Sequence, residues 1–239
     1  MEPSLHSWDL SPAEAAQVQL NLRERLVLAW DKRPITMIGG VDISIKPGPA
    51  TEFGAGSARA AIVVLQYPNL KLLEAVTADA PLVFPYIPGF LAFREGPAVL
   101  GAWEKLKNKP DLLMFDGQGI AHPRGIGIAS LMGLWLERPT IGVAKSRLYG
   151  RHEEVGPQRG DRANLVGKNG NVIGTVLRTR QKANPLYISP GHLIDVEHVT
   201  EFVLACSTCY RLPEPTRWAH KVAGGEILEF ENDDQPRLF

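Results

Sequence analysis

The strongest constraint on the fold is the stretch from residue 111 to residue 144, where two short apolar segments flank a glycine-rich turn and an apolar helix. The two segments, DLLMF and PTIGVA, are almost continuously apolar, a pattern typical of strands that are buried on both faces of a sheet. The order strand, helix, strand predicts that these two strands run parallel. The chain is therefore predicted to be an α/β protein whose ligands bind where the parallel strands end.

The rest of the chain supplies further strands and helices around this unit. Strands are expected at residues 35–45, 58–67, 71–78, 163–168, 171–179 and 186–190, the first three as an antiparallel meander. Further helices are expected from Pro12 to before Pro34, from Pro97 to before Pro110, and from Asp195 to Tyr210. We expect one domain over residues 1–239, with a mixed sheet flanked by helices and a frayed polar tail, ENDDQPRLF.

The composition sets limits on possible partners. Of the 239 residues, 44% are hydrophobic and 22% charged, as in ordinary globular proteins, and the 26 basic and 26 acidic residues cancel. A nucleic-acid partner would therefore have to bind a local cluster of positive charge. The segment from Lys145 to Lys182 is a candidate, because it contains nine basic and only three acidic residues. That cluster fits either a phosphate-binding surface or an ordinary solvated face.

The sequence indicates neither a targeting signal nor a zinc or redox role for its cysteines. The N-terminal MEPSLHSWDL lacks the pattern of a signal peptide, and no apolar stretch is long enough to span a bilayer, so we expect a cytoplasmic protein without membrane contact. Cys206 and Cys209 form one C-x-x-C motif without a second pair or a histidine at zinc-finger spacing. We expect them to be buried or half-buried residues of a helix.

Two aspartates are the first candidates for chemistry. Asp42 lies in the middle of an apolar predicted strand, where a buried carboxylate needs a cation, hydrogen-bond donors or an open cleft. A solvent-facing position on a half-exposed strand is the alternative. Asp116 ends the strand DLLMF, before the glycine-rich turn. If the two strands are neighbours, both carboxylates could hold a divalent cation, and oxygen ligands favour Mg²⁺ or Mn²⁺ over zinc.

Glu95 is a third candidate. It directly precedes the helix predicted from Pro97, and a favourable charge near a helix N-terminus would explain it equally well. The loop just upstream, FPYIPGF at residues 84–90, is rich in proline and carries Tyr86 at its tip. A stiff loop with an aromatic tip can wedge between bases and support the extrusion of a nucleotide.

The turn after Asp116 does not match a dinucleotide-binding motif. Gly117-Gln118-Gly119 begins like one, but His122 stands where the third glycine would be. His122 and Lys145 follow predicted strands in the same region, where Lys145 could place a positive charge at a scissile phosphate.

Asp42 and the segments PYIPGFLAFRE, DGQGIAHPRGIGIAS and PTIGVAKSRLYG occur in the order typical of the endonuclease V family, which this chain resembles from about Val41 to Ala219. Members of that family are deoxyinosine-directed repair nucleases with an RNase H-like fold. The resemblance implies an RNase H-like sheet, Mg²⁺ as cofactor with Mn²⁺ as a substitute, and a monomer that binds inosine-containing DNA, single or double stranded. Inosine in RNA is a further substrate to be tested.

The resemblance also implies the roles of single residues. The implied metal-binding group is Asp42, Glu95, Asp116 and His220, and phosphate handling and catalysis are assigned to His122 and Lys145. The implied wedge and base-binding residues are Pro85, Tyr86, Ile87, Pro88, Gly89, Leu91, Arg94, Gly117 and Ile128. One departure is visible, because Leu131 and Met132 are apolar where some family members carry a histidine.

The implied reaction is hydrolysis of the second phosphodiester bond on the 3′ side of a deaminated base, which leaves 3′-hydroxyl and 5′-phosphate ends. A pocket of main-chain groups suits hypoxanthine, whose N1 proton and O6 present a donor and an acceptor where adenine presents the reverse. The competing hypothesis is a non-catalytic nucleic-acid-binding module on the same scaffold. A nucleotide-dependent phosphotransferase is disfavoured because the chain has no P-loop motif.

Overall fold

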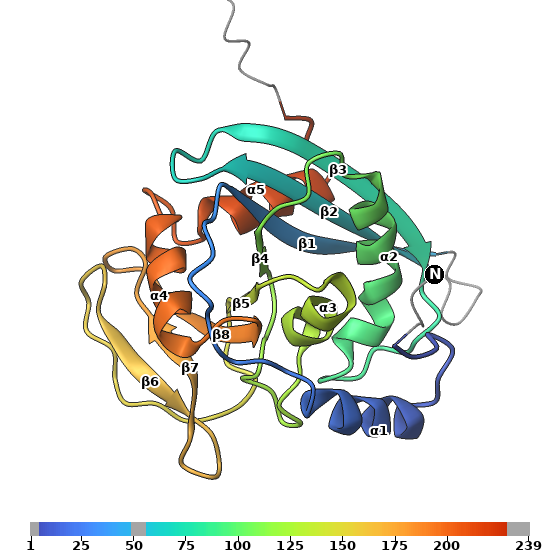
Figure 1. The fold of residues 1–239 in the computed structure, drawn as a ribbon, viewed down its shortest axis with the longest axis horizontal. Coiled ribbons are helices and arrows are strands. Elements are labelled where there is room, and N and C mark those ends of the chain that lie inside the picture. Colours follow the sequence, from blue (N-terminus) through green and yellow to red (C-terminus); the bar gives the residue numbers. More distant parts are fainter. Residues whose placement is uncertain (1–4, 49–55, 229–239) are drawn as a thin grey trace, which may run out of the picture.

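One eight-stranded mixed sheet runs through the computed structural model, which describes residues 5–48 and 56–228 (Figure 1). Its strands are β1 (Met37–Pro47), β2 (Gly56–Gln66), β3 (Leu72–Pro81), β4 (Leu112–Phe115), β5 (Thr140–Ala144), β6 (Arg162–Val166), β7 (Val172–Leu177) and β8 (Leu186–His192). They lie in the order β3-β2-β1-β4-β5-β8-β7-β6. The polar tail expected to fray, residues 231–239, falls outside the described residues.

The pairing of the strands confirms the predicted mixed sheet. β1, β2 and β3 form the expected antiparallel meander, and β4 pairs in parallel with both β1 and β5. β8 then returns antiparallel to β5, followed by the β7 and β6 hairpin. The parallel strands β4 and β5 are buried along their whole length, as their continuous apolar runs indicated.

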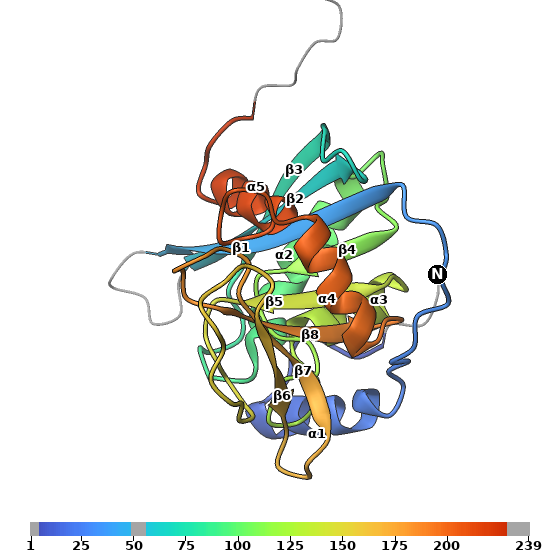
Figure 2. The same ribbon diagram turned by 90° about the vertical axis from the view of Figure 1, so that its left-hand side faces the viewer.

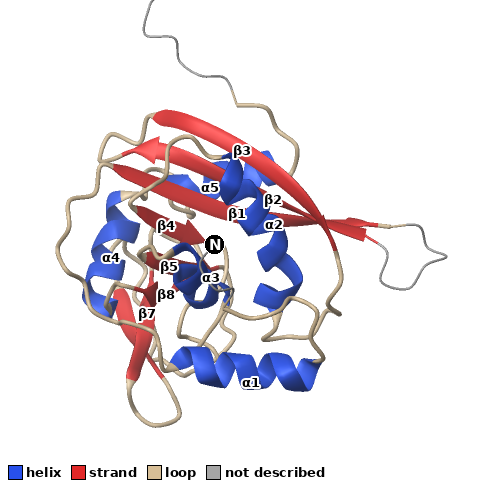
Figure 3. Cartoon of the chain, turned by 45° about the vertical axis from the view of Figure 1, so that its right-hand side comes forward, coloured by secondary structure: helices blue, strands red, loops and turns tan. Residues whose placement is uncertain are grey.

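Five helices cover the sheet within the described residues: α1 (Pro12–Arg23), α2 (Leu91–Lys105), α3 (Ile128–Leu136), α4 (Val196–Ala205) and α5 (Glu214–Ala223). α2 and α3 pack on one face, and α4 and α5 on the other (Figure 2). α1 lies at the end of the layer formed by α2 and α3 (Figure 3). Each layer therefore buries its own apolar core against the sheet. No helix in these ranges combines the length and apolar character needed to span a bilayer.

The first helix begins as predicted but is shorter. Its capping box is present, yet it ends at Arg23 and does not continue toward Pro34. The main chain of Val27 explains this end, because its N–H donates to His192 Nδ1 (3.2 Å) and its carbonyl accepts from Leu193 (2.6 Å). These bonds to His192 and Leu193 replace the main-chain hydrogen bonds that a longer helix would have made.

The second helix begins earlier than predicted. α2 starts at Leu91, so Pro97 lies inside it and Glu95 is a residue of the helix, not of the preceding turn. Proline within a helix costs one hydrogen bond, and the early start is stabilised by the burial of Ala92 and Phe93 in the core. The prediction of a helix that begins at Pro97 is therefore wrong, and this correction changes the interpretation of Glu95.

The C-terminal segment contains two helices instead of one. α4 ends at Ala205, which leaves Cys206 buried just after the helix and Cys209 exposed, and both cysteines are free. The expected burial is confirmed for Cys206 and wrong for Cys209. α5 was not predicted, because Pro213 and Pro215 indicate a loop, whereas proline near the first turn of a helix is well tolerated.

α5 rests directly on β1 because Gly40 has no side chain. A Cβ atom at Gly40 would lie 1.9 Å from the carbonyl oxygen of Pro215, far inside any contact distance. The backbone of the first turn of α5 therefore packs directly against the backbone of β1 at Gly40.

We expect Gly40→Ala to lower the free energy of unfolding by about 1–3 kcal/mol, because the added methyl group must push α5 away from β1. Urea unfolding followed by circular dichroism measures the change. The matched control is Gly101→Ala in α2, whose new methyl group would meet Ala78 at an ordinary 3.4 Å. A Gly40→Ala protein with the wild-type unfolding midpoint would contradict the close seating of α5.

Candidate active site

Parallel pairing of β1 with β4 brings two of the predicted carboxylates side by side. Val41 pairs with Phe115, and the N–H of Asp116 donates to the carbonyl of Val41 at 3.0 Å. Asp42 and Asp116 directly follow this pair of residues, so they lie side by side on two hydrogen-bonded strands. Asp42 is buried, with 7% of its surface exposed, which excludes the alternative of a solvent-facing aspartate.

His220 completes a group that could hold a metal ion. It lies on α5, and its Nδ1 contacts Asp42 Oδ2 at 2.6 Å. One ligand atom from each of Asp42, Asp116 and His220 lies within 4.8 Å of the other two. The predicted association of His220 with the two aspartates is therefore present in the structure.

Glu95 faces the same cluster from α2. Burial, followed by the negative charge of Asp42, raises the pKa of Glu95 to about 8, and the charge of Asp116 adds a smaller contribution. Burial likewise raises the pKa of Asp42, with Asp116 as the second cause. Three carboxyl groups that repel one another in a buried site fit a divalent cation, because the cation would neutralise charge that the protein leaves uncompensated. Oxygen-rich donors of this kind suit magnesium or manganese.

An aromatic contact supports the helical turn that carries Glu95. The next residue is Gly96, where a Cβ atom would lie 2.4 Å from the indole ring of Trp8. Trp8 also stacks on Trp135 of α3, with ring centroids 5.2 Å apart. The segment before α1 therefore packs directly behind the buried glutamate.

Lys145, directly after β5, provides a positive charge at the site. Its ammonium group forms an ion pair with the carboxylate of Asp116. Arg211 fixes the main chain here, since its Nη2 donates to the carbonyls of Lys145 (2.8 Å) and Pro185 (3.0 Å). Sequence reasoning missed Arg211, which lies in a loop with no motif of its own.

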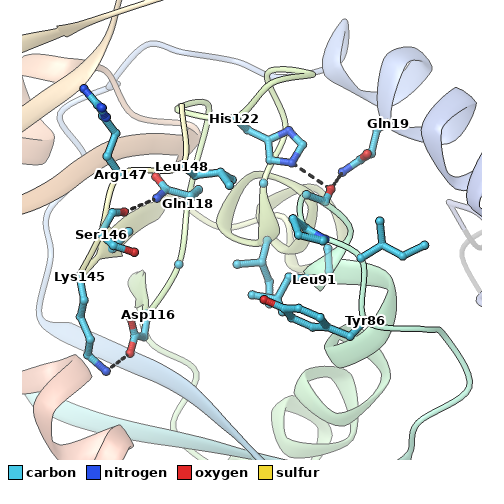
Figure 4. A pocket seen from close by; sticks show the side chains of 18 residues that line it. Gln19, Tyr86, Leu91, Asp116, Gln118, His122, Lys145, Ser146, Arg147 and Leu148 are labelled. Carbon is cyan, nitrogen blue, oxygen red and sulfur yellow. Dashed lines mark hydrogen bonds and ion pairs between the residues drawn. The ribbon is translucent and has the colours of Figure 1, made fainter. Parts of the chain in front are cut away.

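A cavity of about 380 Å³ adjoins the carboxylates and shares Asp116 and Lys145 with them (Figure 4). Its lining includes the predicted base-binding residues Tyr86, Ile87, Pro88, Gly89, Leu91, Gly117 and Ile128. Pro85 and Arg94 are not among its lining residues. Arg94 donates from Nη1 to the carbonyl of Phe84 at 2.8 Å, so its side chain anchors the start of the aromatic loop.

Gln118 also lines the cavity and was not predicted as a site residue. Its Nε2 donates to the carbonyl of Ser146 at 3.1 Å (Figure 4). This bond joins the turn after Asp116 to the residue after Lys145. The DGQG segment that contains Gln118 was the sequence signal that could have identified it.

His122 lines the cavity but does not reach the carboxylate cluster. It is 3% exposed, and burial lowers its pKa to about 4, so the ring is neutral. Its Nδ1 accepts a hydrogen bond from the N–H of Arg124 (3.1 Å), and its Nε2 donates to the carbonyl of Gly89 (2.9 Å). Both ring nitrogens are therefore occupied by main-chain groups, and its phosphate-handling role stays a prediction.

The basic cluster between Lys145 and Lys182 divides into two kinds of residue. Arg178 donates to the carbonyls of Gly156 and Val155, and Arg159 donates to those of Leu204 and Ser207. These arginines hold loops together. Lys145 and Arg147, in contrast, line the cavity beside the carboxylates, where a phosphate group could reach them.

Comparison with known proteins identifies the family. The family model described as Endonuclease V matches residues 20–221. The chain belongs to the endonuclease V family. It is 46% identical to "Endonuclease V" of Rippkaea orientalis over 89% of this chain and 90% of the relative. It is therefore a nuclease that acts on phosphodiester bonds, and the hypothesis of a non-catalytic module is not supported.

Solved structures agree with this assignment. The crystal structure of Endonuclease V from Streptomyces avermitilis superposes with a TM-score of 0.82 at 37% identity, and the match covers 91% of this chain and 93% of that one. Endonuclease V of Ciona intestinalis, in complex with a 24mer DNA containing an inosine followed by a ribo-adenosine, matches with a TM-score of 0.74 at 26% identity over 89% of this chain and 95% of that one. The predicted RNase H-like fold is confirmed.

The raised pKa of Glu95 predicts how stability depends on pH in the metal-free protein. Below its ordinary pKa of 4.5 this carboxyl is protonated whether the chain is folded or not, and the stability it contributes is lost as pH rises toward about 8. With a chelator present, the wild type should therefore lose stability between about pH 5 and pH 8, and Glu95→Gln should lose roughly 3 kcal/mol less over that interval.

Urea unfolding at several pH values measures this difference. The control is Glu104→Gln, which removes an exposed carboxylate from the same helix. If the free energy of unfolding changed equally with pH in the wild type and in Glu95→Gln, the pKa of Glu95 would not be raised in the folded protein.

Proposed function

We propose that this protein cleaves nucleic acid at deaminated bases, chiefly deoxyinosine in DNA, with Mg²⁺ as its cofactor. The observation that carries the proposal is that the carboxylate cluster and the cavity share Asp116 and Lys145, so one nucleic-acid strand can occupy both. The inosine-containing DNA bound to the Ciona intestinalis relative supports the choice of lesion. A single-domain monomer in the cytoplasm remains part of this proposal.

The cavity fits a single extruded base. Its volume of about 380 Å³ is within the usual range for small-molecule sites, and its lining is more apolar than polar. Tyr86 stands at its rim with 71% of its surface exposed (Figure 4). An aromatic ring in this position can fill the gap that a base leaves in the stack, which offsets part of the cost of extrusion.

The carboxylate cluster is suited to phosphodiester hydrolysis. Asp42, Asp116 and His220, with Glu95 beside them, are the residues that would hold the cation. When bound, a divalent cation supplies polarisation of the phosphate and neutralises the charge of the leaving oxygen. Lys145 adds a positive charge at the position where a phosphate would lie, and Glu95 orients the attacking water.

The cleavage position is taken from the family resemblance. The structure is compatible with it, because a cavity that holds the base adjoins the carboxylates through Asp116 and Lys145. We propose the second phosphodiester bond on the 3′ side of the lesion, with 3′-hydroxyl and 5′-phosphate products. Matched DNA and RNA strands with and without inosine, incubated with magnesium or with chelator, test this position and the activity on RNA.

For the metal site, Asp42→Asn and Asp116→Asn should each lower magnesium-dependent cleavage of an inosine-containing duplex at least about a hundredfold, because each removes a negatively charged ligand. Binding to the same duplex in chelator should persist. Gel analysis of end-labelled duplexes measures both. Asp79→Asn, which removes an exposed aspartate from β3, is the control. Wild-type cleavage by either site variant would refute the metal assignment.

For the wedge, Tyr86→Ala should weaken binding to inosine-containing DNA roughly tenfold and binding to undamaged DNA little, because only an extruded base leaves a gap to fill. Fluorescence anisotropy on matched duplexes measures both affinities. Val83→Ala, an exposed apolar residue on the approach to the same loop, is the control. Equal losses on the two duplexes would count against base extrusion.

A further inference from the structure

The carbonyl oxygen of Gly89 receives hydrogen bonds from three side chains. Gln19 Nε2 donates at 3.0 Å, His122 Nε2 at 2.9 Å and Arg124 Nη2 at 2.8 Å. Figure 4 shows the Gln19 and His122 side chains converging on this oxygen from two sides. A carbonyl oxygen has two lone pairs, so three donors saturate it and fix the direction of the peptide group.

The donors are themselves held in place. Gln19 is 1% exposed, and its Nε2 also donates to the carbonyl of Ile126 at 3.1 Å, while its Oε1 accepts from Arg124 Nε at 2.5 Å. The guanidinium group of Arg124 lies over the ring of Phe90, 4.0 Å from its centroid. Gln19 and Arg124 are therefore each held by contacts beyond the carbonyl of Gly89.

Gly89 occupies the position where this geometry matters. It follows the aromatic loop with its exposed Tyr86, lines the cavity, and directly precedes Phe90 and the start of α2. Its φ of +84° lies in the region that favours glycine. A Cβ atom here would lie 2.9 Å from Arg124 Nη2 and 3.1 Å from His122 Nε2, so glycine is what allows these donors to converge.

We infer that Gln19, His122 and Arg124 are positioning residues that fix the base of the aromatic loop against the cavity before nucleic acid binds; we name them the Gly89 clamp. The inference rests on the proposed function, in which this cavity receives the extruded base. A loop that is ordered in advance loses little conformational entropy when it binds, so the clamp favours recognition of the lesion. Undamaged DNA places no extruded base in the cavity, so we expect its binding to depend little on the loop.

The clamp assigns His122 a role apart from phosphate handling. Its ring donates to Gly89 and accepts from the main chain of Arg124, which fixes one neutral form of the imidazole. It also assigns a role to Gln19, which α1 carries far from every motif in the sequence. A fully buried glutamine on a helix exposed along most of its length is otherwise costly to keep.

The test compares Gln19→Leu with Gln17→Leu, the same change on an exposed residue of the same helix, whose side chain bonds to Asn21. Affinity in chelator and cleavage kinetics in magnesium are measured on matched strands with and without inosine. Gln19→Leu should lower the preference for inosine roughly tenfold, with a rise in KM larger than the fall in kcat. Affinity for the undamaged strand should stay within about twofold of wild type, and Gln17→Leu should match wild type throughout.

Arg124→Lys provides a second variant that keeps the positive charge. One ammonium group cannot reproduce the planar fork that bonds Gly89 and Gln19 together, so this variant should also lose preference for inosine. The double variant with Gln19→Leu should lose no more than the larger single loss, because both changes act on the same carbonyl group. If Gln19→Leu does not fold, as judged by circular dichroism, Arg124→Lys decides the question.

Three results would overturn the clamp: wild-type preference in both variants, equal losses on inosine and undamaged strands, or fully additive losses in the double variant. If the proposed function itself were wrong, the wild-type protein would show no preference for inosine, and this result differs from all three.

Discussion

The parallel pairing of β1 with β4 is the constraint on which the site depends. It fixes Asp42 and Asp116 on adjacent strands through main-chain hydrogen bonds, so the two carboxylates cannot relax away from each other. Burial raises the pKa values of Asp42 and Glu95, and the charges of the neighbouring carboxylates raise them further. The fold thus gathers more carboxyl groups than Lys145 alone can neutralise, an arrangement that favours the binding of a cation.

The site joins layers that belong to opposite faces of the sheet. α2 carries Glu95 on one face, and α5 carries His220 on the other (Figure 2). Because these helices pack on opposite faces of the sheet, the sheet between them sets their distance. Glycine at position 40 matters for the same reason, because it determines how near α5 and its histidine come to Asp42.

The sequence predicted the sheet well because its signals are local. Alternating and continuous apolar runs identified all eight strands, and the end of the strand DLLMF placed Asp116 at the ligand-binding edge. Prolines misled the prediction in two places. Pro97 suggested a helix start where burial of Phe93 extends the helix backward, and Pro215 obscured α5.

The parts of the site that escaped prediction depend on contacts between distant residues. Arg211 and Gln19 act through main-chain carbonyls far away in the chain, and neither stands in a pattern that periodicity can reveal. His220 was found through family resemblance alone, since its approach to Asp42 requires the unpredicted α5. Glu95 was assigned to the site mainly through the family resemblance, and its burial became evident only from the fold.

The packing of Trp8 on Gly96 has a practical consequence for handling the protein. This indole lies behind the helical turn that presents Glu95, and it belongs to the short segment that precedes α1. A purification tag or a deletion that disturbs the residues around Trp8 therefore acts on the back of α2, the helix that carries Glu95. Nuclease preparations that differ only in their N-terminal ends should be compared for activity before any substitution in the site is interpreted.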